Sequence, residues 1–510
     1  MSTDKVWKRA SAFDEVGYQP TIDLLTEEIQ ALYLADDIPW VVGYSGGKDS
    51  TAVLQLVWLA LEGLDKSQHT KPVHVISTDT LVENPVVASW VARSLDTMRR
   101  AATTQTLPIE PHRLTPKVED TFWVNLIGKG YPAPRPKFRW CTERLKINPS
   151  NQFIRDVVRE NGEAILVLGT RKAESSTRHA LMTKLEASRV RERLSPNTTL
   201  PNSLVFSPIE NWSNDDVWLF LMQTRNPWGY DNKDLMVMYR GASADNECPL
   251  VVDTTTPSCG SSRFGCWVCT LVDKDRSMEA MIQNDEEKEW MLPLLELREE
   301  LDVPDDRHLR DFRRMDGRVQ LFNDRLIPGP YTQQAREHWL RQLLAAQRDV
   351  RLNGPDDVQD LDLITLEELH EIRRIWVFTK HEMEDSLPRI YEEVTGNPFP
   401  GAALDDQLAF DAGAVELLKE ICGEDQIHFE LTRELLDVER RYSTMSRRAG
   451  LFDVLEKSLR RGFYSDAEDA GDRARQRRDA KQELEDTLDL PNETAVIVSI
   501  PQPKEETHAP

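Results

Sequence analysis

The residue types best suited to chemistry lie in one short run. It consists of Ser45, Gly46, Gly47, Lys48, Asp49, Ser50 and Thr51. Glycine lets the backbone approach a phosphate closely, lysine adds a mobile positive charge, and serine adds hydroxyl donors. The run differs from a Walker A loop, which places four residues between its first glycine and the Gly-Lys pair. Its composition predicts a phosphate-binding loop.

Two flanking elements have to position this loop. The apolar run at 40–42 predicts a buried parallel strand before it, and apolar residues at helical spacing from Val53 to Leu61 predict a helix after it. The free N–H groups and the positive end of that helix then point at the loop. The three parts together predict a nucleotide-phosphate site, and the alternative is a glycine-rich turn before an ordinary helix.

The first 240 residues alternate between strand and helix patterns. Further strands are predicted at 73–77, 109–114, 164–168 and 204–209. This alternation predicts an α/β fold with a doubly wound parallel sheet. Ligands of such sheets bind at the carboxyl ends of the strands. Because Ser45, Asp79 and Arg171 all follow predicted strand ends, we expect them to share one site.

Four of the six cysteines are clustered. They are Cys248, Cys259, Cys266 and Cys269. In a chain without a visible secretion signal, clustered cysteines indicate a metal rather than disulfides. Four thiolates suit either zinc or an iron–sulfur cluster. The turn residue Gly265 and the apolar Trp267 favour the iron–sulfur cluster, and zinc stays an alternative.

A basic, aromatic segment covers residues 131–146. Its cations are Arg135, Lys137, Arg139, Arg144 and Lys146. Cations contact phosphates and aromatic rings stack on bases, so the segment suits a nucleic-acid strand. The alternative is a solvated loop with Trp140 in the core. Cys141 lies among the cations, which would favour its thiolate.

A second cationic group follows the strand predicted at 164–168. It contains Arg171, Lys172 and Arg178. Arginine binds phosphate through paired hydrogen bonds, so this group predicts a phosphate contact. The alternative is a charge cluster at the start of a helix.

The length, charge and apolar content of the chain limit its domain number, its partners and its location. The length of 510 residues predicts about three domains, and the net charge of −24 excludes a general polyanion binder. Neither an apolar leader nor a long apolar run is visible, so we expect a cytoplasmic protein that is not bound to a membrane. The expected regions are an α/β domain at 1–240, a Cys-rich region at 241–290, a helical region at 291–460, and a polar, flexible tail at 461–510. Within the tail, residues 465–487 mix both charge signs and are expected to form a solvated helix or to be disordered.

These features together resemble the DndC and SspD family of bacterial DNA phosphorothioation, whose members are PAPS-reductase-like PP-loop ATP pyrophosphatases. The resemblance covers about residues 10–345. It rests on SGGKDST at 45–51, STDTLVENP at 77–85, FWVNLIGKGYPAPRPKFRWCTERLKINP at 122–149, GTRKAESSTR at 169–178, PIENWSNDDVW at 208–218 and GCWVC at 265–269. It implies an adenine nucleotide alpha-hydrolase-like sheet with an iron–sulfur insertion and a helical C-terminal region.

The resemblance also implies an activity. ATP would be cleaved to AMP and pyrophosphate, and sulfur from a cysteine desulfurase would replace a non-bridging phosphate oxygen of DNA. The implied cofactors are ATP, Mg²⁺ and a 4Fe–4S cluster on the four clustered cysteines. The implied partners are DNA, the desulfurase and other proteins of the phosphorothioation system.

The family chemistry gives the predicted residues their roles. Lys48, with Asp49, the loop amides and Mg²⁺, would stabilise the departing pyrophosphate. Asp79 is a candidate for metal or adenosine contact. Cys141 would relay sulfur or bind the cluster, and Arg171 and Arg178 would hold the target phosphate.

Three other functions compete with this one. A sulfonucleotide (PAPS or APS) reductase would act on a small molecule, but the chain lacks the adjacent cysteine pair of the cluster-bearing forms. A tRNA thiolation enzyme shares the PP-loop, although the late position of the cysteines fits it less well. A DNA-binding iron–sulfur subunit with a relic nucleotide loop would not need an intact Lys48, Asp49 and Ser50.

Overall fold

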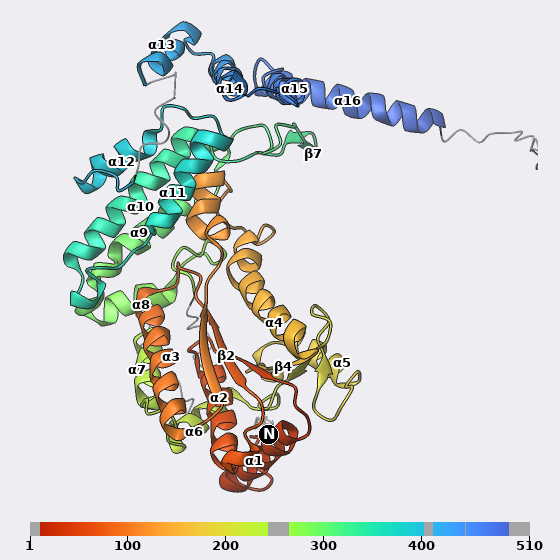
Figure 1. Cartoon of the computed structure of the whole chain (residues 1–510), viewed down its shortest axis with the longest axis vertical. Helices are drawn as coiled ribbons and strands as arrows, with labels where there is room; N and C mark the ends of the chain where they lie inside the picture. The colour runs from red at the N-terminus through yellow and green to blue at the C-terminus, as the bar shows by residue number, and fades with distance from the viewer. Residues whose placement is uncertain (1–10, 243–264, 402–411, 444, 489–510) are drawn as a thin grey trace, which may run out of the picture. The chain divides into compact units, whose positions relative to one another are not determined.

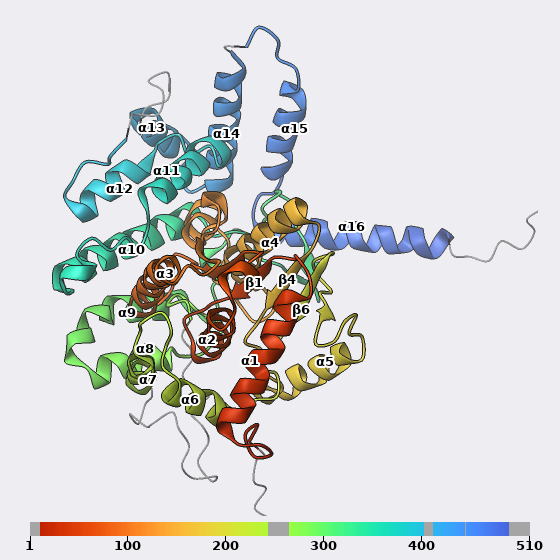
Figure 2. The same cartoon turned by 60° about the horizontal axis from the view of Figure 1, so that its bottom comes forward.

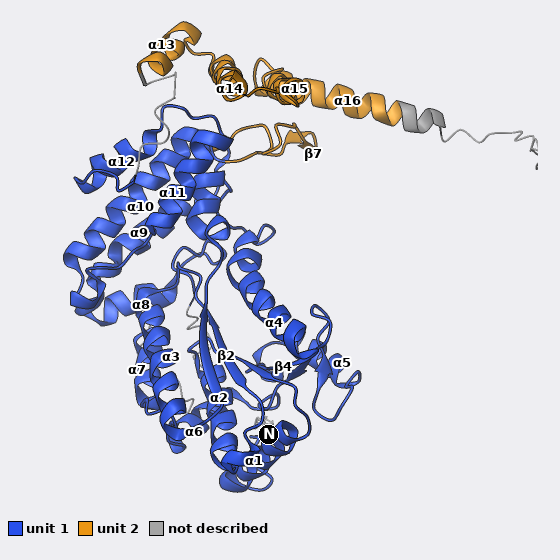
Figure 3. Cartoon of the chain, in the orientation of Figure 1, with its two compact units in different colours: residues 1–309, 331–408 blue, residues 310–330, 409–510 orange. Residues whose placement is uncertain are grey.

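The computed structural model describes residues 11–242, 265–401, 412–443 and 445–488. The chain forms two compact units, one of residues 1–309 and 331–408 and the other of residues 310–330 and 409–510 (Figure 3). The four regions expected from the sequence divide the chain by composition, and that division stays a prediction.

The first unit contains a six-stranded sheet in the order β3-β2-β1-β4-β6-β5 (Figure 1). All neighbouring strands are parallel except β5, which pairs antiparallel with β6. The strands are β1 (Trp40–Gly43), β2 (Val73–Thr78), β3 (Ile109–Leu114), β4 (Ala164–Val167), β5 (Ser195–Pro196) and β6 (Ser203–Phe206). The predicted parallel sheet is confirmed, the ends of the predicted strands lie within three residues of the observed ones, and β5 was not predicted.

Helices cover both faces of this sheet, as a doubly wound fold requires (Figure 2). Trp40 and Val42 of β1 pack into the core under α1, α2, α3, α6 and α7, whereas Val41 points to the opposite face and packs with α4. Side chains alternate along a strand, which explains this division. The helices are α1 (Tyr18–Leu34), α2 (Lys48–Glu62), α3 (Pro85–Gln105), α4 (Asn148–Asn161), α5 (Ser176–Glu186), α6 (Asn214–Gln223) and α7 (Asn232–Gly241).

Local sequence signals set several helix starts. A capping box of Ser213 and Asp216 opens α6, and one of Thr365 and Glu368 opens α11 (Leu366–Arg374). The Asn84 side chain accepts a hydrogen bond from the Val86 amide and caps α3. Short 3₁₀ and π turns are η1 (Lys66–Gln68), η2 (Val118–Asp120), η3 (Val124–Lys129), η4 (Thr142–Ile147), η5 (Lys172–Glu174), η6 (Glu286–Met291), η7 (Arg307–Leu309), η8 (Asp356–Val358) and η9 (Ile375–Thr379).

The helical region of the first unit shares a hydrophobic core with the segment that joins β3 to α4. Trp123 Nε1 donates to the Leu363 carbonyl at 2.8 Å, and Trp376 Nε1 donates to the Ile127 carbonyl at 2.9 Å. Residues 122–145 are therefore built into the helical part of the unit. The helices are α8 (Arg276–Asn284), α9 (Leu292–Leu301), α10 (Gln333–Asn353), α11 (Leu366–Arg374) and α12 (Ser386–Thr395).

The second unit is helical apart from one short hairpin. Arg313 donates to Asp311 at 2.8 Å and to Glu430 at 2.5 Å, and so ties the hairpin segment to α14. The solvated helix that was one of two expectations for the tail appears as α16. The elements are β7 (Leu321–Phe322), β8 (Arg325–Leu326), α13 (Ala412–Cys422), α14 (Gln426–Ser443), α15 (Leu451–Arg461) and α16 (Ala467–Leu488). Among the described residues, none of the helices combines the length and apolar character that a membrane span needs.

Candidate active site

The predicted phosphate loop connects β1 to α2, with Gly47 as the helix N-cap. Gly46 has a φ of +74°, and a Cβ atom there would lie 2.5 Å from Val91 Cγ2 of α3. Both the left-handed backbone and the close approach require glycine. The loop is thus pressed against α3, with the N-terminus of α2 facing it.

Hydroxyl groups hold the loop in shape. Ser50 Oγ accepts from the Ser45 amide at 3.1 Å and donates to the Gly47 carbonyl at 3.0 Å. The Tyr239 hydroxyl accepts from the Lys48 amide at 3.3 Å. Burial raises the pKa of Tyr239 to about 12, so this hydroxyl stays protonated at neutral pH. Sequence reasoning missed Tyr239, which lies 191 positions from Lys48 and carries no local motif.

Three charged side chains meet at the first turn of α2. The Arg171 Nε donates to Asp49 Oδ1 at 2.7 Å, and Lys48 Nζ lies 3.2 Å from Asp49 Oδ2. The Arg171 side chain is 5% exposed, and its Nη1 donates to the Trp212 carbonyl at 3.3 Å. A Cβ on Gly169 would lie 2.8 Å from the Asp49 carbonyl carbon, so the loop after β4 packs directly on the start of α2.

Arg178, the other predicted phosphate ligand, is connected to Arg171 through Glu174. Glu174 Oε1 accepts from the Arg171 amide at 2.9 Å, while its other oxygen pairs with the Arg178 guanidinium. The Arg178 side chain is 43% exposed in the first turn of α5. The exposed Arg178 is thus the more accessible of the two arginines.

Asp79 follows β2, where the sequence placed it. Its Oδ1 accepts from the Leu81 amide at 2.8 Å, and its Oδ2 accepts from Arg113 Nε at 2.9 Å. A small cavity beside it is lined by Ser77, Thr78, Glu83, Ala88, Val91, Ala92 and Arg113. Since Val91 also contacts Gly46, this cavity adjoins the phosphate loop.

The cysteine site is described in part, because Cys248 and Cys259 lie outside the described residues. Cys266 and Cys269 share one tight turn, in which the Cys269 amide donates to the Cys266 carbonyl at 3.1 Å. The side chains of Trp267 and Val268 are buried beneath it. Two thiols on one turn with an apolar cover fit a metal or iron–sulfur cluster.

The strand end that carries Asp79 also reaches the cysteines. Thr80 Oγ1 lies 3.4 Å from Cys266 Sγ, and the Trp267 amide donates to the Val82 carbonyl at 3.0 Å. Glu83 pairs with Lys146 at 3.6 Å. Residues 79–83 therefore run from the phosphate loop to the cysteine turn, so the two sites are neighbours.

Cys141 is the third thiol of this region, and its ionisation differs from the sequence expectation. Burial raises the pKa of Cys141, and the nearby Cys269 raises it further, so the thiolate is not favoured. Burial likewise raises the pKa of Cys266 to about 11, against the opposing effect of Lys146. Burial penalises the charged thiolate, and this effect outweighs the Thr142 hydrogen bond at Cys141 and the Lys146 ammonium at Cys266.

Arg298 is a buried residue that the sequence did not single out. Its Nε donates to the Cys269 carbonyl at 3.1 Å and its Nη1 to the Asp273 carbonyl at 3.1 Å. It also pairs with Asp302 at 3.2 Å. A buried guanidinium that donates to several carbonyls holds the cysteine turn in place.

The basic segment combines core residues and exposed residues. Trp140 is buried and its Nε1 donates to the Pro132 carbonyl at 3.0 Å, so it belongs to the core, as the alternative interpretation expected. Arg135 pairs with Asp302 at 2.6 Å. Phe138, Lys137 and Arg139 are exposed.

A cavity of about 580 Å³ lies beside this segment, at the carboxyl end of β3 and the start of α4. Its lining combines four cations with three acids. These residues are Arg113, Lys117, Arg144, Arg155, Glu119, Asp120 and Asp156. Cys141 is the N-cap of η4, which contains Arg144, so the cavity and the third thiol are close along the chain.

Comparisons with known proteins found similarity over part of the first unit. The family model described as the phosphoadenosine phosphosulfate reductase domain matches residues 39–271. An uncharacterized protein of Methanocaldococcus jannaschii is 25% identical over 190 residues, which are 37% of this chain and 32% of that protein. The chain thus spans about a third of the length of that curated relative.

Two solved structures are also similar. A phosphate complex of phosphoadenylyl-sulfate (PAPS) reductase from Candida auris matches 42% of this chain and 90% of its own, with 14% identity and a TM-score of 0.26. The U34-tRNA thiolase NcsA from Methanococcus maripaludis, with its 4Fe–4S cluster, matches 56% of this chain and 81% of its own, with 12% identity and a TM-score of 0.27. Similarity at this level transfers neither substrate nor cofactor.

Residues 39–271 are therefore similar to the phosphoadenosine phosphosulfate reductase domain. The match begins just before β1 and ends just after Cys269, so it includes both the phosphate loop and the cysteine turn. The fold class predicted from the sequence is confirmed.

Proposed function

We propose that this protein cleaves ATP to AMP and pyrophosphate and uses the activation to transfer sulfur to the phosphate backbone of DNA. The observation that carries the proposal is the path from Asp79 to Cys266. Residues 79–83 adjoin the phosphate loop at one end, and Thr80 Oγ1 lies 3.4 Å from Cys266 Sγ at the other. An activation site beside a thiol site suits sulfur transfer.

The phosphate loop supports the first step of the proposal, in which ATP activates the DNA phosphate. The amides at the start of α2 and the Lys48 ammonium favour a polyphosphate, because both present positive charge to it. Asp49 holds Lys48 and Arg171 in place. These groups would stabilise the charge that develops on pyrophosphate when a DNA phosphate oxygen attacks the α-phosphorus of ATP, and bound Mg²⁺ would supply further positive charge there.

The clustered cysteines support the second step of the proposal, in which sulfur is transferred. Cys266 and Cys269, with Cys248 and Cys259 as the other expected ligands, would hold a 4Fe–4S cluster, which supplies a place to hold sulfide or electrons. Sulfur at the oxidation level of hydrosulfide attacks the adenylated DNA phosphorus, and AMP leaves with the original oxygen. Persulfide sulfur from a cysteine desulfurase needs two electrons to reach that level, so a reductant has to accompany it.

The DNA half is supported by the basic segment and its cavity. Exposed Lys137 and Arg139 offer phosphate contacts, and Phe138 offers a ring for stacking. The cavity of about 580 Å³ is large enough for a nucleotide. The resemblance of residues 122–149 to the phosphorothioation family favours DNA over a free sulfonucleotide.

A reconstitution tests this proposal. Purified holoprotein is incubated without oxygen with ATP, Mg²⁺, cysteine, a cysteine desulfurase, dithionite as reductant, and either DNA or tRNA. The nucleic acid is then digested and its nucleotides are identified by mass spectrometry. We expect dinucleotides with a phosphorothioate link from DNA, and pyrophosphate in the same reaction.

Other outcomes identify the competing functions. Thiolated bases in tRNA with unmodified DNA would establish tRNA thiolation. Sulfite formed from PAPS or APS would establish sulfonucleotide reduction. In a matched pair, Cys141→Ser should lose phosphorothioate while Cys422→Ser keeps it, because Cys141 lies beside the Cys266–Cys269 turn and Cys422 belongs to the second unit.

A further inference from the structure

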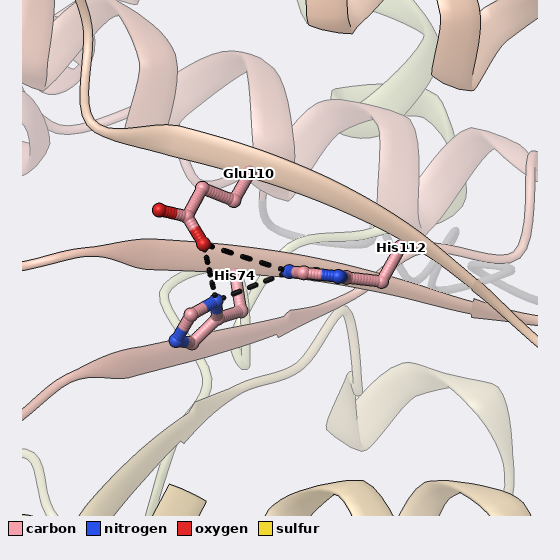
Figure 4. Close-up of side chains that lie close together, drawn as sticks. All are labelled: His74, Glu110 and His112. Carbon is pink, nitrogen blue, oxygen red and sulfur yellow. Dashed lines mark hydrogen bonds and ion pairs between the residues drawn. The ribbon is translucent and has the colours of Figure 1, made fainter.

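Three side chains of metal-binding types meet on the sheet, away from the cysteine turn. His74 belongs to β2, and Glu110 and His112 belong to the edge strand β3. His74 is paired in register with Glu110, and Ile76 with His112. Register partners and residues two apart point to the same face, so all three side chains lie together on one face of the sheet (Figure 4). Phe153 of α4 packs on that face.

Their donor atoms converge on one point (Figure 4). His74 Nδ1 lies 3.1 Å from His112 Nε2 and 3.2 Å from Glu110 Oε2, and His112 Nε2 lies 3.8 Å from the same carboxylate oxygen. Metal bonds of about 2.0–2.2 Å at tetrahedral angles separate ligand atoms by about 3.3–3.6 Å. The three observed separations therefore bracket the edges of a tetrahedral site.

The surroundings suit imidazole ligands. Phe153 of α4 packs against both imidazoles, with ring centroids 5.5 Å from His74 and 4.9 Å from His112. Burial lowers the pKa of each histidine, which favours the neutral imidazole that offers a lone pair to a metal. The carboxylates of Glu110 and Glu160 raise the pKa of His74, whereas the Arg99 guanidinium lowers the pKa of His112.

We propose that His74, Glu110 and His112 bind one divalent transition metal ion, with Zn²⁺ as the expected ion and water completing its coordination. Two neutral imidazoles and one carboxylate form a donor set that zinc accepts, with a position left open. Hydrogen bonds without a metal explain this arrangement less well. A single proton on His74 Nδ1 would have to be shared between His112 Nε2 at 3.1 Å and Glu110 Oε2 at 3.2 Å.

The ion would clamp the edge of the sheet. It would join β2 to β3, the outermost strand of the order β3-β2-β1-β4-β6-β5. The same two strands carry Asp79 and Arg113 toward their carboxyl ends, where these residues pair at 2.9 Å. A metal in this position stabilises the strand pair that presents the residues beside the phosphate loop, and it is independent of the proposed DNA chemistry.

The test measures zinc in the full-length holoprotein. Protein that retains its iron is given one equivalent of ZnCl₂, dialysed, and examined by zinc-edge X-ray absorption, where iron does not interfere. We expect about one zinc per chain with only nitrogen and oxygen neighbours near 2.0 Å. Sulfur neighbours near 2.3 Å, or no retained zinc, would overturn the proposal.

Two variants complete the test. His74→Gln/His112→Gln should lose the retained zinc, whereas His179→Gln, which changes an exposed histidine of α5, should keep it. Zinc should also raise the Tm of the wild-type protein and of His179→Gln by a few degrees, and leave that of the double variant unchanged. Zinc that survives in a folded double variant with the same nitrogen and oxygen shell would refute the assignment.

Discussion

Arg171 reaches from the loop after β4 to the first turn of α2 and donates its Nε hydrogen to Asp49 at 2.7 Å. The two residues are separated by 122 positions. Their pairing fixes the start of the phosphate-loop helix against a neighbouring strand end. Asp49 therefore connects the buried Arg171 with Lys48, the residue expected to contact phosphate.

Removing the carboxylate of Asp49 should destabilise the fold. Asp49→Asn leaves the nearly buried Arg171 guanidinium without its anionic partner, and we expect the free energy of unfolding to fall by about 2–3 kcal/mol. Urea denaturation measures this change. Asp234→Asn, which alters an exposed acid in the first turn of α7, should cost less than about 0.5 kcal/mol. Equal effects of the two substitutions would contradict the assigned role of the pair.

Lys48→Ala should abolish ATP cleavage in a protein that still folds. Lys48 lies at the start of α2, where a cation opposes the charge of departing pyrophosphate. Loss of such a contact costs a few kcal/mol in the transition state, which is about 10²-fold or more in rate. Pyrophosphate release measures the effect, and Lys66→Ala on η1 is the control. Near-normal cleavage by folded Lys48→Ala protein would end the PP-loop assignment.

Gly46→Ala should damage the loop through the backbone. Alanine at a φ of +74° is strained, and its Cβ would lie 2.5 Å from Val91 Cγ2. We expect a loss of about 1–2 kcal/mol from the backbone conformation alone, with weaker binding of ATP. A nonhydrolysable ATP analogue in calorimetry measures that binding.

Two companion variants separate strain from crowding. Gly46→Ala/Val91→Ala should recover part of the binding, because it removes the close contact and leaves only the strained φ. Gly241→Ala in α7 adds a Cβ in open space and should bind the analogue normally. Normal binding by Gly46→Ala itself would show that the loop does not need glycine.

The cysteine turn should bind iron. Protein purified without oxygen should contain about four iron and four acid-labile sulfide per chain if the site is cubane-type. Cys266→Ser and Cys269→Ser should each lower the iron content, because both thiols lie on the described turn. Cys422→Ser in α13 should leave iron unchanged. Stoichiometric zinc without acid-labile sulfide in the wild-type protein would show that the cysteines bind zinc and not an iron–sulfur cluster.

Two exposed cations should contribute to DNA binding. Lys137→Ala/Arg139→Ala should weaken binding and reduce the slope of log K against log salt by about 2, since each phosphate contact contributes about 0.9. Fluorescence anisotropy at several salt concentrations measures the slope. Arg135 is left intact because it pairs with Asp302 inside the fold.

A control pair gives this experiment its contrast. Lys233→Ala/Arg389→Ala removes two exposed cations from α7 and α12, and its salt slope should equal that of wild-type protein. An unchanged slope in Lys137→Ala/Arg139→Ala would reduce the segment to an ordinary solvated loop. ATP cleavage should survive in both pairs, because neither touches the phosphate loop.

The sequence alone determined the parts of this protein that depend on near neighbours. The strand before Ser45, the glycine loop and the helix after it were predicted because apolar periodicity and helix-end chemistry act over a few residues. The parallel sheet followed from the repetition of such signals. The turn that contains Cys266 and Cys269 was visible for the same reason, since two residues separate its thiols.

Only the tertiary structure decided which distant groups meet. Strand order and register brought His74 to Glu110 and His112, and no local pattern contains that pairing. Burial placed Trp140 in the core and raised the pKa of Cys141, although both lie in a basic segment. Side-chain contacts and desolvation depend on what packs across the fold, so residue type and spacing cannot fix them.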